Sequence, residues 1–445
     1  MLRGSFPIKR CLCALSLSAC AGFSASAQNY TTDGTGLPIL NSSAGSAGVL
    51  YMDFTGATFS GTTRDPFNNT FSTAEDDPNT FFGSERVDIY DAWLDIATHF
   101  AMFDINVTTV APNKATTPTG HQVIFNSTGG GSANSGVFGF STDGPDQARG
   151  QNSSRNLRNR ATSITHEFGH ILGLAHHNQY DANGDYVAQY ESVSAEGVAK
   201  MMGIDYGSTG SSVSRFSSWQ QGLAYGNTTT NIKGTAQDDR AVIAATLIAK
   251  YNEFSGDTYT GDGYRLDEHG NDAIGATALT LTNDGPAAND QINVSAATTG
   301  IIERLTDIDM FSIDWAGGDL SVTAEAVRSV ASASSYALEY ASSLGMQLSL
   351  YDDLGQLIDQ DGGNALDRSG TGLVDITASN DVDATISASD LAAGTYYFAV
   401  ESLGDYDDLG AYTLDLTGVS AVPEPQSLIM LLGGMTLLIR RRRRA

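Results

Sequence analysis

The sequence predicts an α+β domain followed by an antiparallel β-sandwich domain, and three observations predict this fold class. Residues 48–252 combine short apolar runs, typical of strands, with longer stretches whose apolar residues recur at helical spacing. Residues 276–419 hold short alternating segments separated by turn residues, which is the pattern of a sandwich. Residues 253–275 are rich in Gly and Asp, which indicates a linker between the two domains.

The first domain is expected to follow residues 28–47, where Ser, Gly, Thr and Asn indicate a loop or a short pro-segment. An apolar run predicts a strand at 49–54. Helical spacing predicts an amphipathic helix over 85–102, and the apolar residues that set this spacing are Val87, Tyr90, Leu94 and Ala97. Further strands are predicted at 105–110, 122–125 and, as an edge strand before a second helix, 136–140.

The second helix carries the pattern that is most informative about function. His166 and His170 lie four residues apart, so both side chains project from one face of a helix and can reach one metal ion. Glu167 is placed to reach a metal-bound water rather than the metal itself. Gly173 can adopt the left-handed conformation that ends a helix, and the turn then returns His176 to the metal.

Three protein ligands leave a fourth position open for water, which is typical of a catalytic rather than a structural zinc site. A His-Glu-x-x-His pattern alone also occurs on ordinary helices with partly exposed polar residues. The addition of Gly173 and His176 at fixed offsets favours the zinc site over that alternative.

The run from His166 to His176 resembles the zinc signature of the metzincin metallopeptidases, and residues 48–250 resemble their exported bacterial, reprolysin-like members. The resemblance implies a zincin fold with a twisted mixed sheet, an edge strand that pairs with substrate, a zinc ion and Glu167 as the general base. It also implies a methionine turn beneath the metal, for which Met202 is the candidate and Met201 the fallback.

Several positions depart from the family pattern or leave alternatives open. The residue after the third histidine is His177 in this chain, whereas the known branches have another residue type at that position. Some branches place a zinc-reaching tyrosine where this chain has Ile204, so Tyr206 is either an oxyanion stabiliser or a packed tyrosine. Asp33 either binds the zinc in a latent enzyme or lies in an ordinary turn. Asp181 begins either a degenerate calcium loop or a plain Asp-rich turn.

Both ends of the chain carry export signals. Residues 1–27 have the basic start, apolar core and small-residue end of a signal peptide cleaved after Ala27, with lipoprotein cleavage before Cys20 as the alternative. Residues 420–445 resemble a PEP-CTERM sorting signal, with Pro-Glu-Pro at 423–425, an apolar run and an arginine cluster. A plain tail anchor is the alternative to this signal.

The sorting-signal resemblance implies a Gram-negative bacterium, an exosortase-type processing enzyme, transient membrane contact through the tail and a location at the cell surface or outside the cell. All three cysteines, Cys11, Cys13 and Cys20, lie in the leader, so the mature chain is expected to fold without disulfides. The net charge of −27 argues against nucleic acid as a partner, because phosphate binding needs a basic surface.

Strands of the second domain are predicted at 292–294, 310–315, 320–324, 346–351, 395–400 and 412–416. Residues 307–312, 348–352 and 393–397 resemble the bacterial pre-peptidase C-terminal domain. Asp307 and Asp309 either bind calcium or are solvated turn carboxylates.

The sequence therefore predicts an exported zinc endopeptidase that acts on protein or peptide substrates, with calcium as a second candidate metal. An alternative from a different class is an extracellular matrix or surface-binding protein with a vestigial or narrowly dedicated zinc domain. The complete set of three histidines and the intact Glu167 favour the enzyme.

Overall fold

A computed structural model describes residues 30–55, 57–59, 62–64, 81, 83–113, 117, 119–124, 133, 135–139, 157–191, 199–203, 217–224, 234–288, 291–329, 339–340, 342, 344–362, 383–406 and 408–421. The predicted leader, Tyr206 and nearly all of the predicted sorting tail lie outside the described residues. Within the described part, no helix is both long and apolar enough to cross a membrane. The described chain is mostly β-structure in several sheets, with three helices.

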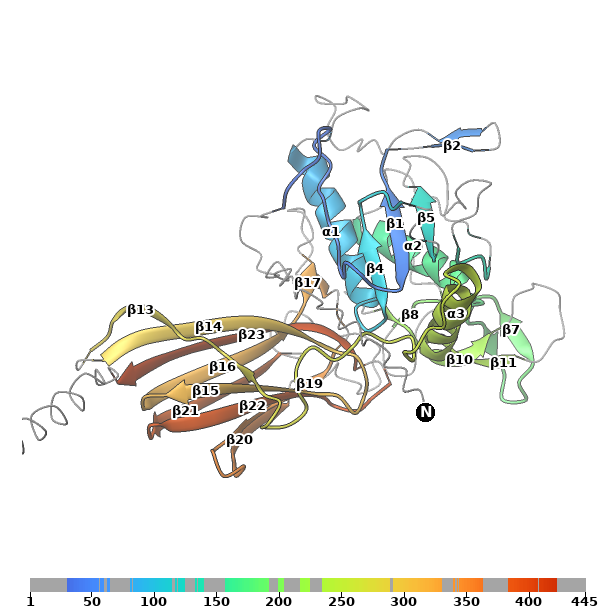
Figure 1. Ribbon diagram of the computed structural model, residues 1–445. Helices are drawn as coiled ribbons and strands as arrows, with labels where there is room; N and C mark the ends of the chain where they lie inside the picture. Colours follow the sequence, from blue (N-terminus) through green and yellow to red (C-terminus); the bar gives the residue numbers. More distant parts are fainter. Residues whose placement is uncertain are drawn as a thin grey trace, which may run out of the picture.

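The first domain is built on a three-stranded parallel sheet in the order β4-β1-β5 (Figure 1). The central strand β1 (Gly48–Asp53) is buried along its whole length, as expected for a strand with neighbours on both sides. β4 (Ile105–Thr108) and β5 (Gly120–Ile124) flank it, each in parallel register. The strands predicted at 49–54, 105–110 and 122–125 are thus confirmed, with shifts of a few residues at their ends.

Three helices belong to the described residues, and two of them were predicted. α1 (Gly83–His99) and α2 (Leu157–Ile171) pack against each other, and the Phe100 ring just after α1 meets the edge of Phe168 with centroids 6.0 Å apart. The third helix, α3 (Asp239–Phe254), was not predicted. It begins at Asp238, whose side chain accepts a hydrogen bond from the Ala241 N–H as a helix N-cap.

Two expectations for the sheet are wrong among the described residues. Residues 136–139 form a turn and an irregular segment instead of an edge strand, and the sheet is wholly parallel instead of mixed. The physical reason lies at Gly136, which has a φ of 73° and donates its N–H to the His170 carbonyl. This N–H therefore satisfies the end of α2 and is not available to a strand ladder.

Short hairpins and bridges complete the first domain. The remaining strands are β2 (Ala57–Phe59), β3 (Thr62–Arg64), β6 (Gln179–Tyr180), β7 (Tyr186–Ala188), β8 (Ala199–Lys200), β9 (Ser217–Ser218), β10 (Gln221–Ala224) and β11 (Thr235–Asp238). β10 and β11 form an antiparallel hairpin that leads directly into α3.

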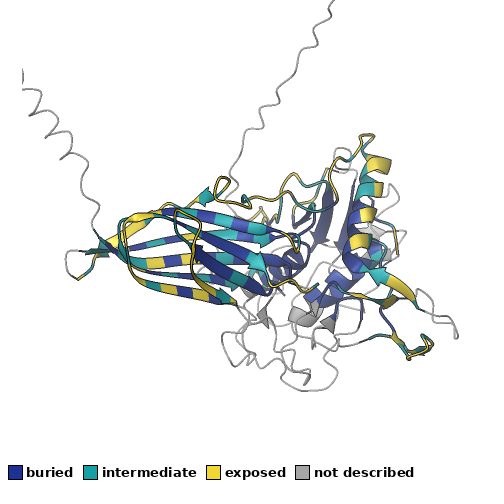
Figure 2. Cartoon of the chain, turned by 90° about the horizontal axis from the view of Figure 1, so that it is seen from below, coloured by how far each residue is buried: buried dark blue, intermediate teal, exposed yellow. Residues whose placement is uncertain are grey.

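The second domain is a β-sandwich of two five-stranded sheets, ordered β12-β15-β22-β19-β20 and β13-β14-β23-β16-β21. All pairings are antiparallel except that between β12 and β15. Its strands are β12 (Thr277–Ala278), β13 (Thr282–Pro286), β14 (Gln291–Ile302), β15 (Ile308–Trp315), β16 (Gly318–Ala326), β19 (Met346–Tyr351), β20 (Leu357–Gly362), β21 (Ala384–Leu391), β22 (Gly394–Ser402) and β23 (Gly410–Ala421), beside the small pair β17 (Arg328–Ser329) and β18 (Glu339–Tyr340). Burial alternates along the inner strands, so one face of each sheet forms the core (Figure 2).

The two domains touch through specific side chains. The Tyr264 ring, in the linker, stacks on Phe103 of the first domain with centroids 5.5 Å apart. Tyr406, in the loop between β22 and β23, donates its hydroxyl to Asp238 at 2.5 Å, and the Arg240 guanidinium lies 3.5 Å from the centre of the Tyr406 ring. The start of α3 therefore contacts the sandwich directly.

Candidate metal centre

Three imidazoles converge at the end of α2. His166 and His170 lie one turn apart on the helix, and their ring centroids are 4.8 Å apart. α2 ends at Ile171, and Gly173 has a φ of 97°, which confirms the predicted left-handed turn. The chain then places His176 so that one nitrogen of each histidine lies within 4.8 Å of the other two.

Backbone carbonyls fix the orientation of the two helical histidines. His166 Nδ1 lies 2.7 Å from the Met201 carbonyl oxygen, and His170 Nδ1 lies 2.8 Å from that of Leu174. Because a carbonyl oxygen can only accept, both Nδ1 atoms carry the proton and both Nε2 atoms keep a free lone pair. The His170 and His176 Nε2 atoms face each other at 2.8 Å. This donor set suits zinc, which takes neutral imidazole nitrogens.

The surroundings keep the three imidazoles neutral at pH 7. Burial, followed by the neighbouring histidines, lowers the pKa of His166 well below its usual range. Burial also lowers the pKa of His170, and that of His176 falls to about 4. Neutral imidazole is the form that binds a metal ion, so the site does not have to lose protons first.

Glu167 sits beside the histidines in a buried environment. Its side chain is 6% exposed, and burial raises its pKa to about 7. A carboxyl group with a pKa near the working pH can both accept and return a proton. Glu167 therefore provides a buried proton acceptor one residue after His166 on α2.

A methionine side chain packs against the helix that carries His166 and His170. Residues 200–203 form a tight turn in which the Gly203 N–H donates to the Lys200 carbonyl. Met202 is fully buried, and its sulfur would lie only 2.5 Å from a β-carbon placed on Gly169. The glycine between the two helical histidines thus makes room for Met202. Met201 instead provides the carbonyl that orients His166.

Sequence reasoning missed several neighbours of this centre. The Tyr190 ring lies over His176 with centroids 4.6 Å apart, and Tyr190 has a φ of 70°, which is rare for a tyrosine. The side chains of His177 and Asp239 form a fully buried pair at 2.9 Å. No local sequence pattern predicts these contacts. The first depends on the left-handed backbone conformation of Tyr190, and the second joins two residues that lie far apart in the chain.

Other candidate residues lie in ordinary turns. One carboxylate oxygen of Asp33 accepts hydrogen bonds from the N–H groups of Thr35 and Leu37, and Asp33 does not belong to the histidine cluster. Asp181 accepts from the N–H groups of Asn183 and Asp185 in the β6–β7 turn. Both geometries match the turn alternative for these aspartates.

A second group of potential metal ligands lies where the linker meets the sandwich. Asp267, Asp307 and Asp309 bring carboxylate oxygens within 4.8 Å of one another. Asp307 is 5% exposed and Asp309 is 0% exposed, so the solvated-turn alternative is wrong for both. Asp309 accepts a hydrogen bond from the Tyr412 hydroxyl on one oxygen, and its other oxygen has no partner among the described residues.

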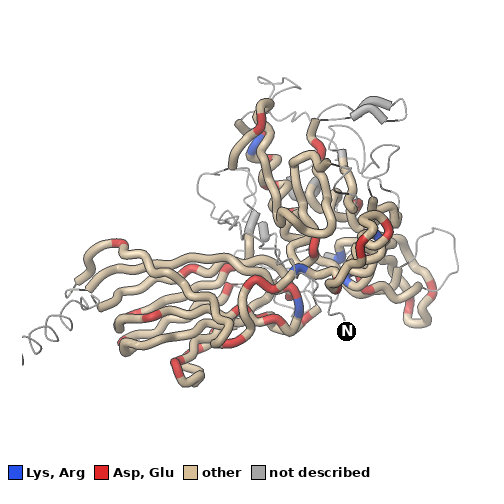
Figure 3. The backbone as a smooth tube through the Cα atoms, in the orientation of Figure 1, with Lys and Arg blue, Asp and Glu red and all other residues tan. Residues whose placement is uncertain are grey.

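The ionised form of the carboxyl groups in this second group is disfavoured when no cation is present. Burial, together with Glu268 and Asp307, raises the pKa of Asp309 to about 9 although the Tyr412 hydroxyl opposes the shift. Burial and the same kind of neighbours raise the pKa of Glu303. Arg265 partly offsets the charge at Glu268. Asp and Glu residues also outnumber Lys and Arg residues along the described parts of both domains (Figure 3).

No protein-family model matches this chain, and no curated protein does either. Among solved structures, it is similar to the pre-peptidase C-terminal domain of a collagenase from Bacillus anthracis, at 14% identity over 27% of this chain and 84% of that chain, with a TM-score of 0.16. It is also similar to the K3 cleaved adhesin domain of Lys-gingipain from Porphyromonas gingivalis, at 12% identity over 32% and 74% of the two chains, with a TM-score of 0.14. These likenesses are weak and partial, and they carry no argument about activity.

Proposed function

We propose that the protein is a zinc-dependent endopeptidase of the metzincin type. His166, His170 and His176 hold the zinc ion, and Glu167 is the general base. The observation that carries the proposal is the convergence of three neutral imidazole nitrogens within 4.8 Å beside a buried carboxyl group.

The chemistry divides between the metal and the chain. Zinc, when bound, acts as a Lewis acid towards a peptide carbonyl and makes water more acidic. Glu167 accepts a proton from the attacking water and returns it to the leaving amine, a role that suits its raised pKa. The backbone carbonyls of Met201 and Leu174 hold the helical imidazoles in one orientation throughout.

The arrangement of elements supports the metzincin assignment. After β1 and the short hairpin β2–β3, the chain forms α1, then the strands β4 and β5, and then the histidine-bearing helix α2. A methionine turn then approaches α2 from below, with Met202 against Gly169. Apart from the edge strand and the mixed sheet, which the described residues do not form, this order agrees with what the sequence resemblance implies for residues 48–250.

The remaining parts of the proposal concern location and partners. The leader and the sorting tail, by their sequences, point to an exported protein processed by an exosortase-type enzyme in a Gram-negative bacterium. The substrate is a protein or peptide that reaches the cell surface or the surroundings. The acidic charge supports the absence of a nucleic-acid partner.

We further propose calcium at the junction of linker and sandwich, with Asp267, Asp307 and Asp309 as ligands. Two observations favour it: one buried oxygen of Asp309 has no hydrogen-bond partner among the described residues, and Asp309 brings a carboxylate oxygen within 4.8 Å of those of Asp267 and Asp307. Calcium prefers carboxylate oxygens and compensates their charge. The proposed role is structural, because the group lies outside the histidine cluster.

The test is casein hydrolysis by the full-length protein before and after metal removal, alongside Glu167→Gln. We expect chelation to abolish hydrolysis and added zinc to restore it. Glu167→Gln should lower the rate by about 10²–10⁴-fold with zinc still bound, because general-base catalysis contributes about that factor. A variant that cleaves as fast as the wild type would refute the role of Glu167, and zinc binding without cleavage of any protein substrate would favour the matrix-binding alternative.

A further inference from the structure

The third histidine differs from the other two in what holds it. His166 and His170 are fixed by the helix itself, whereas residues 174–176 belong to no helix or strand. Among the described residues, the one hydrogen-bond contact of His176 Nδ1 is with the Gln189 amide at 3.5 Å, beside the ring contact with Tyr190. The position of this ligand must therefore be set by the residues on either side of it.

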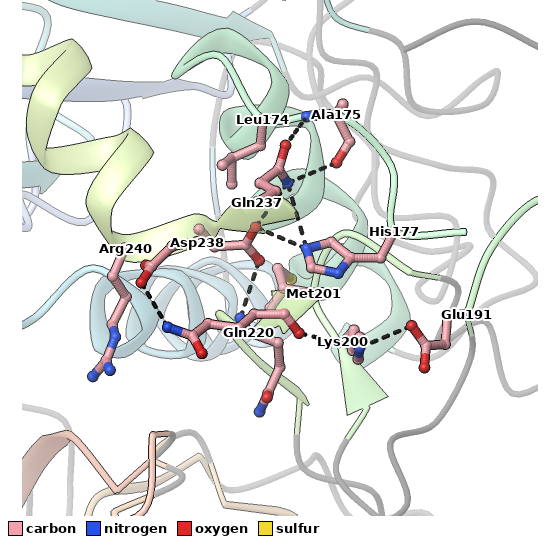
Figure 4. A network of polar contacts seen from close by, with 12 residues as sticks. Leu174, Ala175, His177, Glu191, Lys200, Met201, Gln220, Gln237, Asp238 and Arg240 are labelled. Atoms are coloured by element: carbon pink, nitrogen blue, oxygen red, sulfur yellow. Dashed lines mark hydrogen bonds and ion pairs between the residues drawn. The ribbon is translucent and has the colours of Figure 1, made fainter. Parts of the chain in front are cut away.

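Both flanking residues are held by one short segment at the β11–α3 corner (Figure 4). Before His176, the Ala175 N–H donates to Gln237 Oε1 at 3.0 Å, and Gln237 Nε2 donates to the Ala175 carbonyl at 3.0 Å. After His176, His177 Nε2 donates to Asp239 Oδ1 at 2.9 Å. The backbone of His177 is also fixed, since its N–H donates to the Met202 carbonyl.

The chemistry of the segment is specific to these residue types. Asp239 accepts three hydrogen bonds, from His177 and Gln237 on one oxygen and from the Gln220 N–H on the other. An asparagine would have to turn a donor towards one of these donors. Gln237 both donates to and accepts from Ala175, and neither a carboxylate, which only accepts, nor an apolar side chain can do this.

We infer that Gln237 and Asp239 are positioning residues for the third zinc ligand. They do not touch the metal; they clamp the chain on both sides of His176 so that its imidazole meets the other two. The inference rests on the proposed zinc site. It adds two residues whose contacts join positions 62 residues apart in the chain. Groups that hydrogen-bond directly to a metal ligand contribute about 10–100-fold to metal affinity in other sites, and we take this range for residues that hold the chain on both sides of the ligand.

A purely structural role for the same bonds makes a different prediction. A buried pair that only stabilises the fold would, when broken, lower the thermal stability of the metal-free protein and leave the geometry at zinc unchanged. A positioning pair changes how tightly the metal is bound and how the ligands surround it. The two roles therefore separate in metal-binding measurements that do not depend on peptidase activity.

The experiment compares full-length wild type, Gln237→Met, Asp239→Asn and the matched control Gln221→Met. Gln221 lies on β10 opposite Asp238, and its amide donates to Asp238 at 2.8 Å without contacting Ala175 or His177. Zinc affinity is measured by competition with a chelator, and the visible absorption of the Co²⁺-loaded protein reports ligand geometry. Thermal unfolding of the metal-free proteins shows whether each variant folds.

We expect Gln237→Met and Asp239→Asn to bind zinc about 10–100-fold more weakly and to alter the Co²⁺ spectrum, while Gln221→Met matches the wild type. If one of the two variants does not fold, the other still decides the question. Unchanged zinc affinity and Co²⁺ spectrum in a folded variant would overturn this inference alone. A wild-type protein without zinc affinity would overturn the proposed function, and the inference with it.

Discussion

Each imidazole of the proposed metal centre is oriented either by a hydrogen bond to a main-chain carbonyl or by the chain segments on either side of it. The Met201 and Leu174 carbonyls set the tautomers of His166 and His170, and burial keeps the rings neutral. Glu167 shares that burial, so its pKa rises towards 7. Burial thus has two effects. It keeps the imidazoles in the neutral form that binds a metal ion, and it gives Glu167 a pKa at which the carboxyl group can exchange protons near neutral pH.

Burial also raises the pKa of a carboxyl group at the sandwich junction, and there it makes the stability of the metal-free protein depend on pH. The pKa of Asp309 is raised to about 9 in the folded protein, against about 4 for an unfolded aspartate. Between these values the folded state binds more protons than the unfolded state, so the contribution of Asp309 to stability is lost as the pH rises through this range. We expect metal-free wild type to lose stability relative to Asp309→Asn between pH 5 and pH 9.

Calcium should reverse this loss at pH 8, adding about 2.7 kcal/mol to wild-type stability at about 100 times its Kd. The control is Asp314→Asn, an exposed position on the same strand β15. Thermal unfolding with and without calcium measures both effects. A stability difference that does not vary with pH, or calcium stabilisation equal in wild type and Asp309→Asn, would refute the calcium site.

At the scale of elements, α2 and the methionine turn pack closely against each other. A β-carbon on Gly169 would lie 2.5 Å from the Met202 sulfur, 3.1 Å from Trp219 and 3.2 Å from Leu174. The helix therefore approaches the turn as closely as a glycine permits. The Met201 carbonyl reaches His166 because of this approach.

Gly169→Ala tests this packing. Helix propensity alone favours alanine by about 1 kcal/mol, whereas overpacking of a filled core costs about 1–3 kcal/mol. We expect a net loss of unfolding free energy, which denaturant unfolding measures. The loss should shrink or vanish in a Met202→Ala background, since that substitution empties the contested space. Stabilisation by Gly169→Ala in the wild-type background would show that the contact is not tight.

The burial of a strand decides whether the sequence predicts it. The six sandwich strands predicted from the sequence, among them β14, β16 and β22, are the inner strands of the two sheets. The strands that were missed, β12, β13, β20 and β21, are the four edges. β13 and β20 are mostly exposed, so they need no regular apolar alternation and give no periodic signal.

The site divides in the same way. The histidine spacing along α2 is a local pattern and could be read from the sequence. α3 was not predicted because its apolar residues lie on all sides of the helix and give no helical periodicity. Among them only Ile243, Ala244 and Leu247 are buried. The contacts of Gln237 and Asp239 join residues 62 positions apart, and no periodicity reports such a distance.

At the scale of the whole molecule, the proposed metal centre and the contact between the domains share the segment Asp238–Asp239. The residue before Asp239 caps α3 and accepts the hydroxyl of Tyr406 from the sandwich, while Asp239 itself holds His177. The sandwich and the third histidine are therefore tied to consecutive residues of one segment. The sandwich is thus part of the surroundings that support the centre.

The most direct test of the central claim is a zinc titration of the metal-free, full-length protein in which bound zinc and casein hydrolysis are followed together. We predict that hydrolysis rises with each addition and stops rising at about one zinc per chain, as expected for one catalytic site. Hydrolysis that is independent of bound zinc, or no zinc uptake at the first equivalent, would contradict the account.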